Sequence, residues 1–99
     1  MAHLSWTEPA LRDLESIAEY IALDKPEAAK SFVQKVFRTT ERPVRFPKSG
    51  RVPPEIPDLP YRELIVPPCR IFYRVERGTA YVVHVLRSER ELREKSFEE

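Results

Sequence analysis

Two segments in the first half of the chain carry apolar side chains at helical spacing. The first, about Glu8 to Leu23, holds one apolar stripe made by Ala10, Leu14, Ile17, Ala18 and Ile21. The second begins at Pro26 and ends at Pro43, and its stripe consists of Ala29, Phe32, Val33, Val36 and Phe37. Each pattern predicts an amphipathic helix. Because only a short break separates the two segments, they are expected to form an antiparallel helical hairpin.

Helix-start signals support both predictions. Thr7 stands where a hydroxyl would accept a hydrogen bond from the exposed amides of the first turn. Pro26 suits the first helical position, since that position needs no amide hydrogen.

The second half of the chain is typical of strands. The proline-rich stretch from Pro43 to Pro60 predicts an ordered surface loop, because proline fixes the backbone and removes ladder donors. Three runs rich in Val, Ile, Tyr and Phe follow it: Tyr61 to Val66, Cys69 to Glu76 and Thr79 to Leu86. They predict an antiparallel meander, and His3 to Trp6 is a candidate first strand. Ser88 to Lys95 predicts a short, solvated C-terminal helix.

These elements predict one α+β domain over residues 1–99, with the N-terminal helical hairpin packed on a small, mostly antiparallel sheet. In the middle run, Ile71, Tyr73 and Val75 alternate with Arg70, Phe72 and Arg74. The first set would face the helices. The second set would stand on an uncovered face of the sheet, which suits either an acidic peptide or a sugar-phosphate chain with a stacked base.

Composition narrows the class of protein. Ninety-nine residues with 41% hydrophobic content provide one compact core. Seventeen basic against sixteen acidic side chains leave a net charge of +1, so a polyanion would have to be bound by a local patch. A single cysteine, Cys69, and two scattered histidines predict neither an internal disulfide nor a metal site. We expect no cofactor. The absence of a secretory signal or a long apolar run predicts a cytoplasmic protein.

Several residues could carry chemistry, and each has a structural alternative. The arginines at 62, 70, 74 and 87 could hold carboxylates or phosphates, or could pair with Glu63 or Glu76 across strands. His84 could move protons, although a core histidine with a hydrogen-bonded ring is commoner. Glu55 could act as a general base, although most loop glutamates are simply solvated.

Five sequence segments, in this order, resemble the RelE/ParE toxin superfamily. They are Trp6-Thr7-Glu8-Pro9-Ala10, Pro26-Glu27-Ala28-Ala29, Pro47-Lys48-Ser49-Gly50-Arg51, Tyr61-Arg62-Glu63-Leu64 and Arg70-Ile71-Phe72-Tyr73-Arg74-Val75. The resemblance spans nearly the whole chain. It implies the toxin of a type II toxin–antitoxin module, and its implied fold agrees with the one predicted from periodicity.

The superfamily has two known activities: ParE-like members inhibit DNA gyrase, and RelE-like members cut messenger RNA on the ribosome. The phrases from Gly50 to Glu55 and from Tyr61 to Val66 are more similar to the ParE branch. Arg87 stands where the nucleases often place a histidine, and an arginine cannot serve as a general base. The resemblance therefore favours a non-enzymatic gyrase inhibitor, neutralised by a cognate antitoxin of the ribbon-helix-helix type with an acidic tail.

Under that hypothesis the antitoxin covers Arg70, Phe72 and Arg74, whereas the target is contacted by Arg87, Arg90 and Arg93. The alternative is a metal-independent, ribosome-dependent mRNA endoribonuclease. Its candidate residues are Arg70 and Arg87 for phosphate charge, and Glu55 or His84 for proton transfer. A third hypothesis is a degenerate toxin that only binds its antitoxin.

Overall fold

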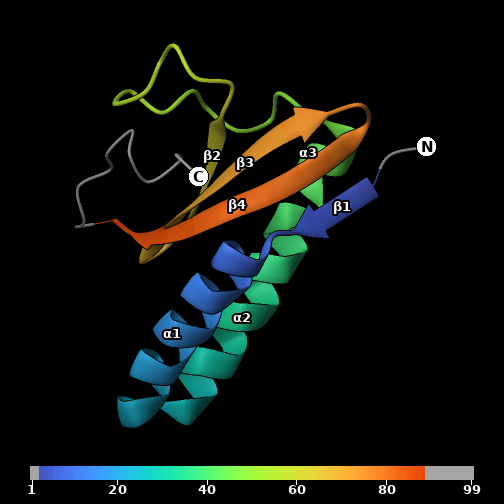
Figure 1. Ribbon diagram of the computed structural model, residues 1–99. Helices are drawn as coiled ribbons and strands as arrows, with labels where there is room; N and C mark the ends of the chain where they lie inside the picture. Colours follow the sequence, from blue (N-terminus) through green and yellow to red (C-terminus); the bar gives the residue numbers. More distant parts are fainter. Residues whose placement is uncertain (1–2, 89–99) are drawn as a thin grey trace.

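The computed structural model describes residues 3–88, which form a four-stranded sheet and three helices (Figure 1). In chain order the elements are β1 (His3–Trp6), α1 (Glu8–Asp24), α2 (Pro26–Thr40), α3 (Arg42–Arg45), β2 (Arg62–Val66), β3 (Cys69–Glu76) and β4 (Thr79–Arg87). The predicted α+β class, the helical hairpin and the mostly antiparallel sheet are confirmed.

The strands lie in the order β1-β4-β3-β2. β2, β3 and β4 form the predicted antiparallel meander, while β1 runs parallel to β4, with Trp6 opposite Val82. β3 and β4 are joined by Arg77 and Gly78, which both have positive φ (49° and 79°). This combination is typical of the type I′ turn, whose twist matches the twist of the flanking strands.

Both long helices begin as the sequence predicts. The Thr7 side chain accepts a hydrogen bond from the amide of Ala10 at 3.4 Å, and its hydroxyl donates to the carbonyl of Val82 at 2.9 Å. This second bond ties the start of α1 to β4. Proline occupies the first turn of both helices, where its missing amide hydrogen leaves no bond unmade.

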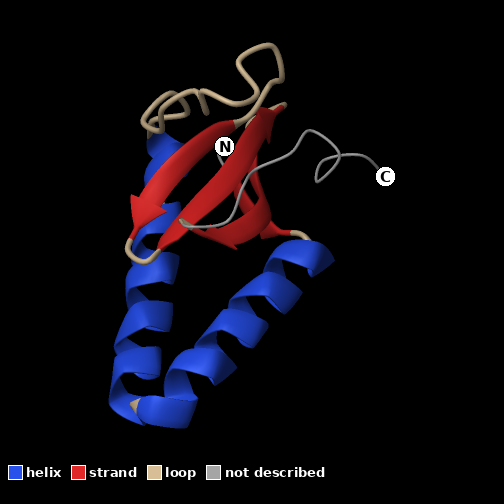
Figure 2. Cartoon of the chain, turned by 90° about the vertical axis from the view of Figure 1, so that its left-hand side faces the viewer, coloured by secondary structure: helices blue, strands red, loops and turns tan. Residues whose placement is uncertain are grey.

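The main core lies between the hairpin and one face of the sheet. Ala10 and Leu14 of α1 and Phe32 and Val36 of α2 are buried there against strand residues that include Ile71. Figure 2 shows that the hairpin extends beyond the sheet. No helix in the described part of the chain is long and apolar enough to cross a membrane.

A second, smaller apolar cluster lies on the opposite face of the sheet. Ile56 from the proline-rich loop packs on Phe72 of β3, and both are almost completely buried. Leu59, Val83 and Leu86 surround them. The loop therefore covers part of the face that the sequence predicted to be open.

Two predicted boundaries need comment. The second helix ends at Thr40, and a separate short helix, α3, follows with Pro43 in its first turn, so the loop does not begin at Pro43. Helix α3 was missed because proline is read as a helix end, although it is equally suited to a helix start. The helix predicted from Ser88 to Lys95 lies outside the described residues, apart from Ser88.

Candidate functional site

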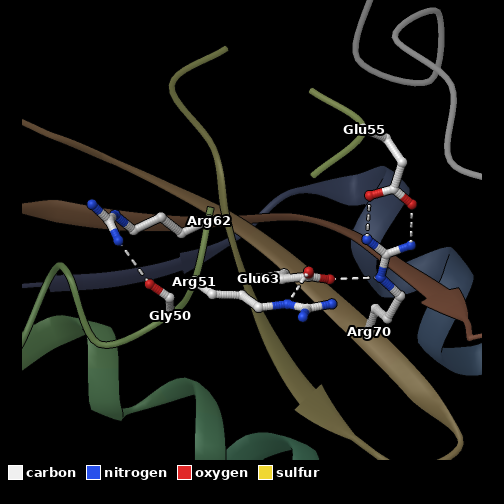
Figure 3. A network of polar contacts seen from close by, with 6 residues as sticks. All are labelled: Gly50, Arg51, Glu55, Arg62, Glu63 and Arg70. Carbon is white, nitrogen blue, oxygen red and sulfur yellow. Dashed lines mark hydrogen bonds and ion pairs between the residues drawn. The ribbon is translucent and has the colours of Figure 1, made fainter. Parts of the chain in front are cut away.

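Arg70 lies at the centre of a network of charged side chains on the loop-covered face of the sheet (Figure 3). Its Nη1 and Nη2 donate to the two carboxylate oxygens of Glu55 at 2.7 and 2.8 Å. Its Nε donates to Oε1 of Glu63 at 2.5 Å. Only 7% of Arg70 is exposed. The guanidinium is thus held by one carboxylate from the loop and one from β2, in the paired geometry that arginine favours.

Glu63 connects the loop to the sheet. Its side chain is completely buried, and its second oxygen, Oε2, accepts a hydrogen bond from Nε of Arg51 at 2.6 Å. The backbones of Arg51 and Glu63 also exchange two hydrogen bonds, at 2.9 and 3.1 Å. A carboxylate without water needs such partners, since an unpaired buried charge is strongly unfavourable. Here two arginines supply them.

The network shifts the pKa values of two of its members. The hydrogen bonds from Arg70 hold the pKa of the Glu55 carboxyl below its ordinary value, although partial burial acts in the opposite direction. The pKa of Arg70 is raised still further, chiefly by its hydrogen bonds to Glu55. Both groups are therefore fixed in their charged forms at neutral pH.

Gly50 and Tyr73 fix the start of the loop. The Tyr73 hydroxyl accepts a hydrogen bond from the amide of Gly50 at 2.9 Å and donates to the carbonyl of Pro47 at 2.8 Å. Nη1 of Arg62 donates to the carbonyl of Gly50 at 2.8 Å (Figure 3). A Cβ atom on Gly50 would lie 2.6 Å from the carbonyl oxygen of Glu63, so only glycine fits this close approach.

The predicted uncovered face of Arg70, Phe72 and Arg74 is wrong for two of its three residues. Arg70 lies under Glu55 and Glu63, and Phe72 is fully buried under Ile56. Alternation along the strand gave the correct side for these side chains, but the loop packs on that same side. Arg74 remains partly exposed, with its guanidinium 4.6 Å from the Tyr81 ring and 3.3 Å from Glu76.

The four residues predicted for nuclease chemistry do not share their contacts. Arg70 and Glu55 bind each other. Nδ1 of His84 contacts Oδ2 of Asp13 on α1 at 3.1 Å, and the same oxygen accepts the amide of Val85 at 3.0 Å.

Arg87, predicted for both nuclease chemistry and target contact, stacks on the Tyr20 ring of α1 at 4.9 Å. Arg90 and Arg93 lie outside the described residues. Among residues 3–88, no group of His, Cys, Asp or Glu side chains could hold a metal ion.

Comparisons with known proteins agree with this architecture. Residues 4–92 match the family model described as the ParE toxin of the type II toxin–antitoxin system parDE. The chain belongs to this toxin family. It is 33% identical over 86 residues to Toxin RelE2 of Caulobacter vibrioides, a match that covers 86% of this chain and 93% of the relative.

A solved structure of the chromosomal ParDE toxin–antitoxin system from P. aeruginosa is similar to this ParE-family toxin. The two have a TM-score of 0.75 and are 25% identical, with 90% of this chain and 98% of the other covered. The resemblance to the RelE/ParE superfamily is thereby confirmed. One relative carries a RelE name and the other a ParDE title, so the comparisons leave both activities of the superfamily open.

Two residues of the network were not predicted as members of the site. Glu63 was considered only as a cross-strand partner for arginines, and Arg51 only as part of the family resemblance. A glutamate between Arg62 and Leu64 in a β-rich run could have indicated Glu63, because a carboxylate on a covered strand requires a cation beside it.

Proposed function

We propose that this ParE-family toxin inhibits DNA gyrase without catalysing a reaction, and that a cognate antitoxin neutralises it in the cytoplasm. The observation that carries the proposal is the engagement of Arg70 by Glu55 and Glu63. A metal-independent nuclease needs a cation that is free to bind phosphate and an acid–base group that can exchange a proton. In this site the cation and the carboxylate neutralise each other.

Proton transfer points in the same direction. A general acid or base works best when its pKa lies near the operating pH, whereas the pKa of Glu55 is lowered by Arg70. His84, the other candidate proton carrier, contacts Asp13 of α1 and not Glu55. The geometry supports a protein that acts by binding.

The first experiment is a supercoiling assay with purified gyrase. We expect the toxin to inhibit supercoiling in a saturable manner and its antitoxin to restore activity. The double variant Arg90→Ala with Arg93→Ala tests the proposed target contact, with Arg38→Ala and Arg42→Ala as a control of equal charge change on α2 and α3. Unchanged gyrase activity at saturating toxin would refute the proposal.

Toxin RelE2, the named relative, keeps a RelE-like endoribonuclease as the second candidate. Primer extension on translated messenger RNA distinguishes the two activities. Codon-positioned cuts that disappear in Glu55→Gln would favour the nuclease. This variant keeps a side chain of the same size in a partly exposed position, so loss of cleavage could be separated from loss of fold by circular dichroism.

Antitoxin binding on the loop-covered face would have to use its accessible residues. Arg74 is accessible, whereas Arg70 and Phe72 are buried. The antitoxin would therefore contact the outer surface of the loop and Arg74, leaving the Arg70 network intact beneath.

A further inference from the structure

A cleft of about 280 Å³ opens between the proline-rich loop and the end of β3. Three cations line it: Lys48 from the loop, Arg62 from β2 and Arg74 from β3. Its apolar walls come from Val52, Leu59 and Val75. The volume lies just below the range of about 300–1,000 Å³ that is typical for small-molecule sites, so the cleft suits part of a larger partner.

The charge in this cleft is uncompensated. None of the described residues that line it is acidic. Lys48 and Arg62 make no ion pair within residues 3–88, and Arg74 has only the exposed Glu76 at 3.3 Å. In a chain with a net charge of +1, this is a local positive field beside apolar walls.

The same cleft borders an incomplete part of the sheet. Tyr73, opposite Arg62, is the last residue of β3 that pairs with β2. The three residues that follow, Arg74 to Glu76, pair with β4 on one side only. A strand with one unpaired edge can accept another extended chain through backbone hydrogen bonds.

We propose that this cleft binds an extended, acidic segment of a partner protein, which adds a short strand beside Arg74–Glu76. Carboxylates of the segment would meet Lys48, Arg62 and Arg74. An apolar side chain between two carboxylates would lie against Val52 and Val75, both of which are partly exposed. The inference does not depend on gyrase as the target, because it concerns the binding of the segment alone.

A protein segment fits these observations better than a nucleic acid does. A sugar-phosphate chain would satisfy the three cations, but it has no amide groups to pair with the open edge of β3. It would also leave the apolar walls without a matching group, unless a base stacked there. A polypeptide with alternating carboxylate and apolar side chains satisfies the cations, the walls and the edge together, since side chains alternate along a strand.

The test uses a short fluorescent peptide in which glutamate alternates with valine, titrated with the full-length toxin. We expect saturable binding that weakens as salt is added, because exposed charges are screened. Lys48→Glu should weaken binding about tenfold, whereas Lys35→Glu, the same charge change on an exposed face of α2, should not. Equal binding by the two variants would overturn the proposal.

Three further probes address the chemistry of the partner. A peptide that alternates lysine with valine should not bind. An oligothymidylate of similar length should bind more weakly than the acidic peptide, and tighter binding would assign the cleft to nucleic acid instead. An N-methylated acidic peptide keeps its charges but cannot donate to β3, so its affinity should fall. If methylation had no effect, the edge-pairing part of the proposal would be wrong.

Discussion

Arg70 and Glu55 form a two-point contact in which both terminal nitrogens of the guanidinium donate to separate oxygens of the carboxylate. The two residues are 15 positions apart in the chain. Their contact, together with the bond from Arg70 to Glu63, fastens the proline-rich loop to the sheet. The residue that the sequence offered as a binding group for another molecule is thus already bound within its own chain.

The first prediction concerns Arg70 itself. Arg70→Leu should lower the free energy of unfolding by about 3 kcal/mol, because it removes one partner of a buried ion pair and leaves Glu63 with Arg51 alone. Urea unfolding followed by circular dichroism measures the change. Arg12→Leu is the control, since the exposed pair of Arg12 and Glu8 should contribute no more than about 0.5 kcal/mol. Similar losses in both variants would contradict the structural role of Arg70.

The second prediction is a pH dependence caused by Glu55. The pKa of this carboxyl is lowered in the folded protein from its ordinary 4.5, so the unfolded chain binds more protons in the interval between the two values. The stabilisation is therefore complete above about pH 4.5 and is lost as the pH falls through the folded pKa.

Unfolding measured at several pH values should show this loss in the unmodified chain and a weaker dependence in Glu55→Gln. Asp58→Asn provides the control, because Asp58 lies in the same loop and makes no ion pair within the described chain. If Glu55→Gln kept the full acid sensitivity, Glu55 would not be its source.

The sequence predicted the fold well because the fold follows from local patterns. Helical periodicity placed α1 and α2, and β-rich runs between turn residues placed β2, β3 and β4 to within one or two residues. Each of these signals depends on side chains close together in the chain. The prediction of which side Arg70 and Phe72 face was also correct, since alternation is a local property.

The site could be predicted only in part, because its contacts join distant segments. Alternation states which way Phe72 points but not that Ile56 packs on it. His84 was expected to lack an orienting partner nearby in sequence, and its partner is Asp13, 71 positions away. Such pairings depend on how the loop and α1 pack on the sheet, for which a single sequence carries no direct signal.

The third prediction tests the close approach at Gly50. Gly50→Ala places a methyl group 2.6 Å from the carbonyl oxygen of Glu63 and 2.7 Å from Cε1 of Tyr73. We expect a loss of about 2 kcal/mol in the free energy of unfolding, because overpacking forces the backbone to move. Ser49→Ala, at the exposed neighbouring position, should change little. Because the Glu63 oxygen belongs to the backbone, adding Tyr73→Phe should not rescue Gly50→Ala, and a full rescue would place the conflict at the hydroxyl instead.

The last prediction tests whether Phe72 anchors the loop. Phe72 is fully buried against Ile56, so Phe72→Ala should lower the free energy of unfolding by about 3 kcal/mol through lost burial and a residual cavity. Phe46→Ala removes a ring of the same size that is 63% exposed, and it should cost less than about 0.5 kcal/mol. Because the lost contact holds the loop to the sheet, Phe72→Ala should also speed tryptic cleavage after Arg51 under native conditions. Unchanged cleavage in Phe72→Ala would mean that the charged contacts of Arg70 and Glu63 hold the loop without this ring.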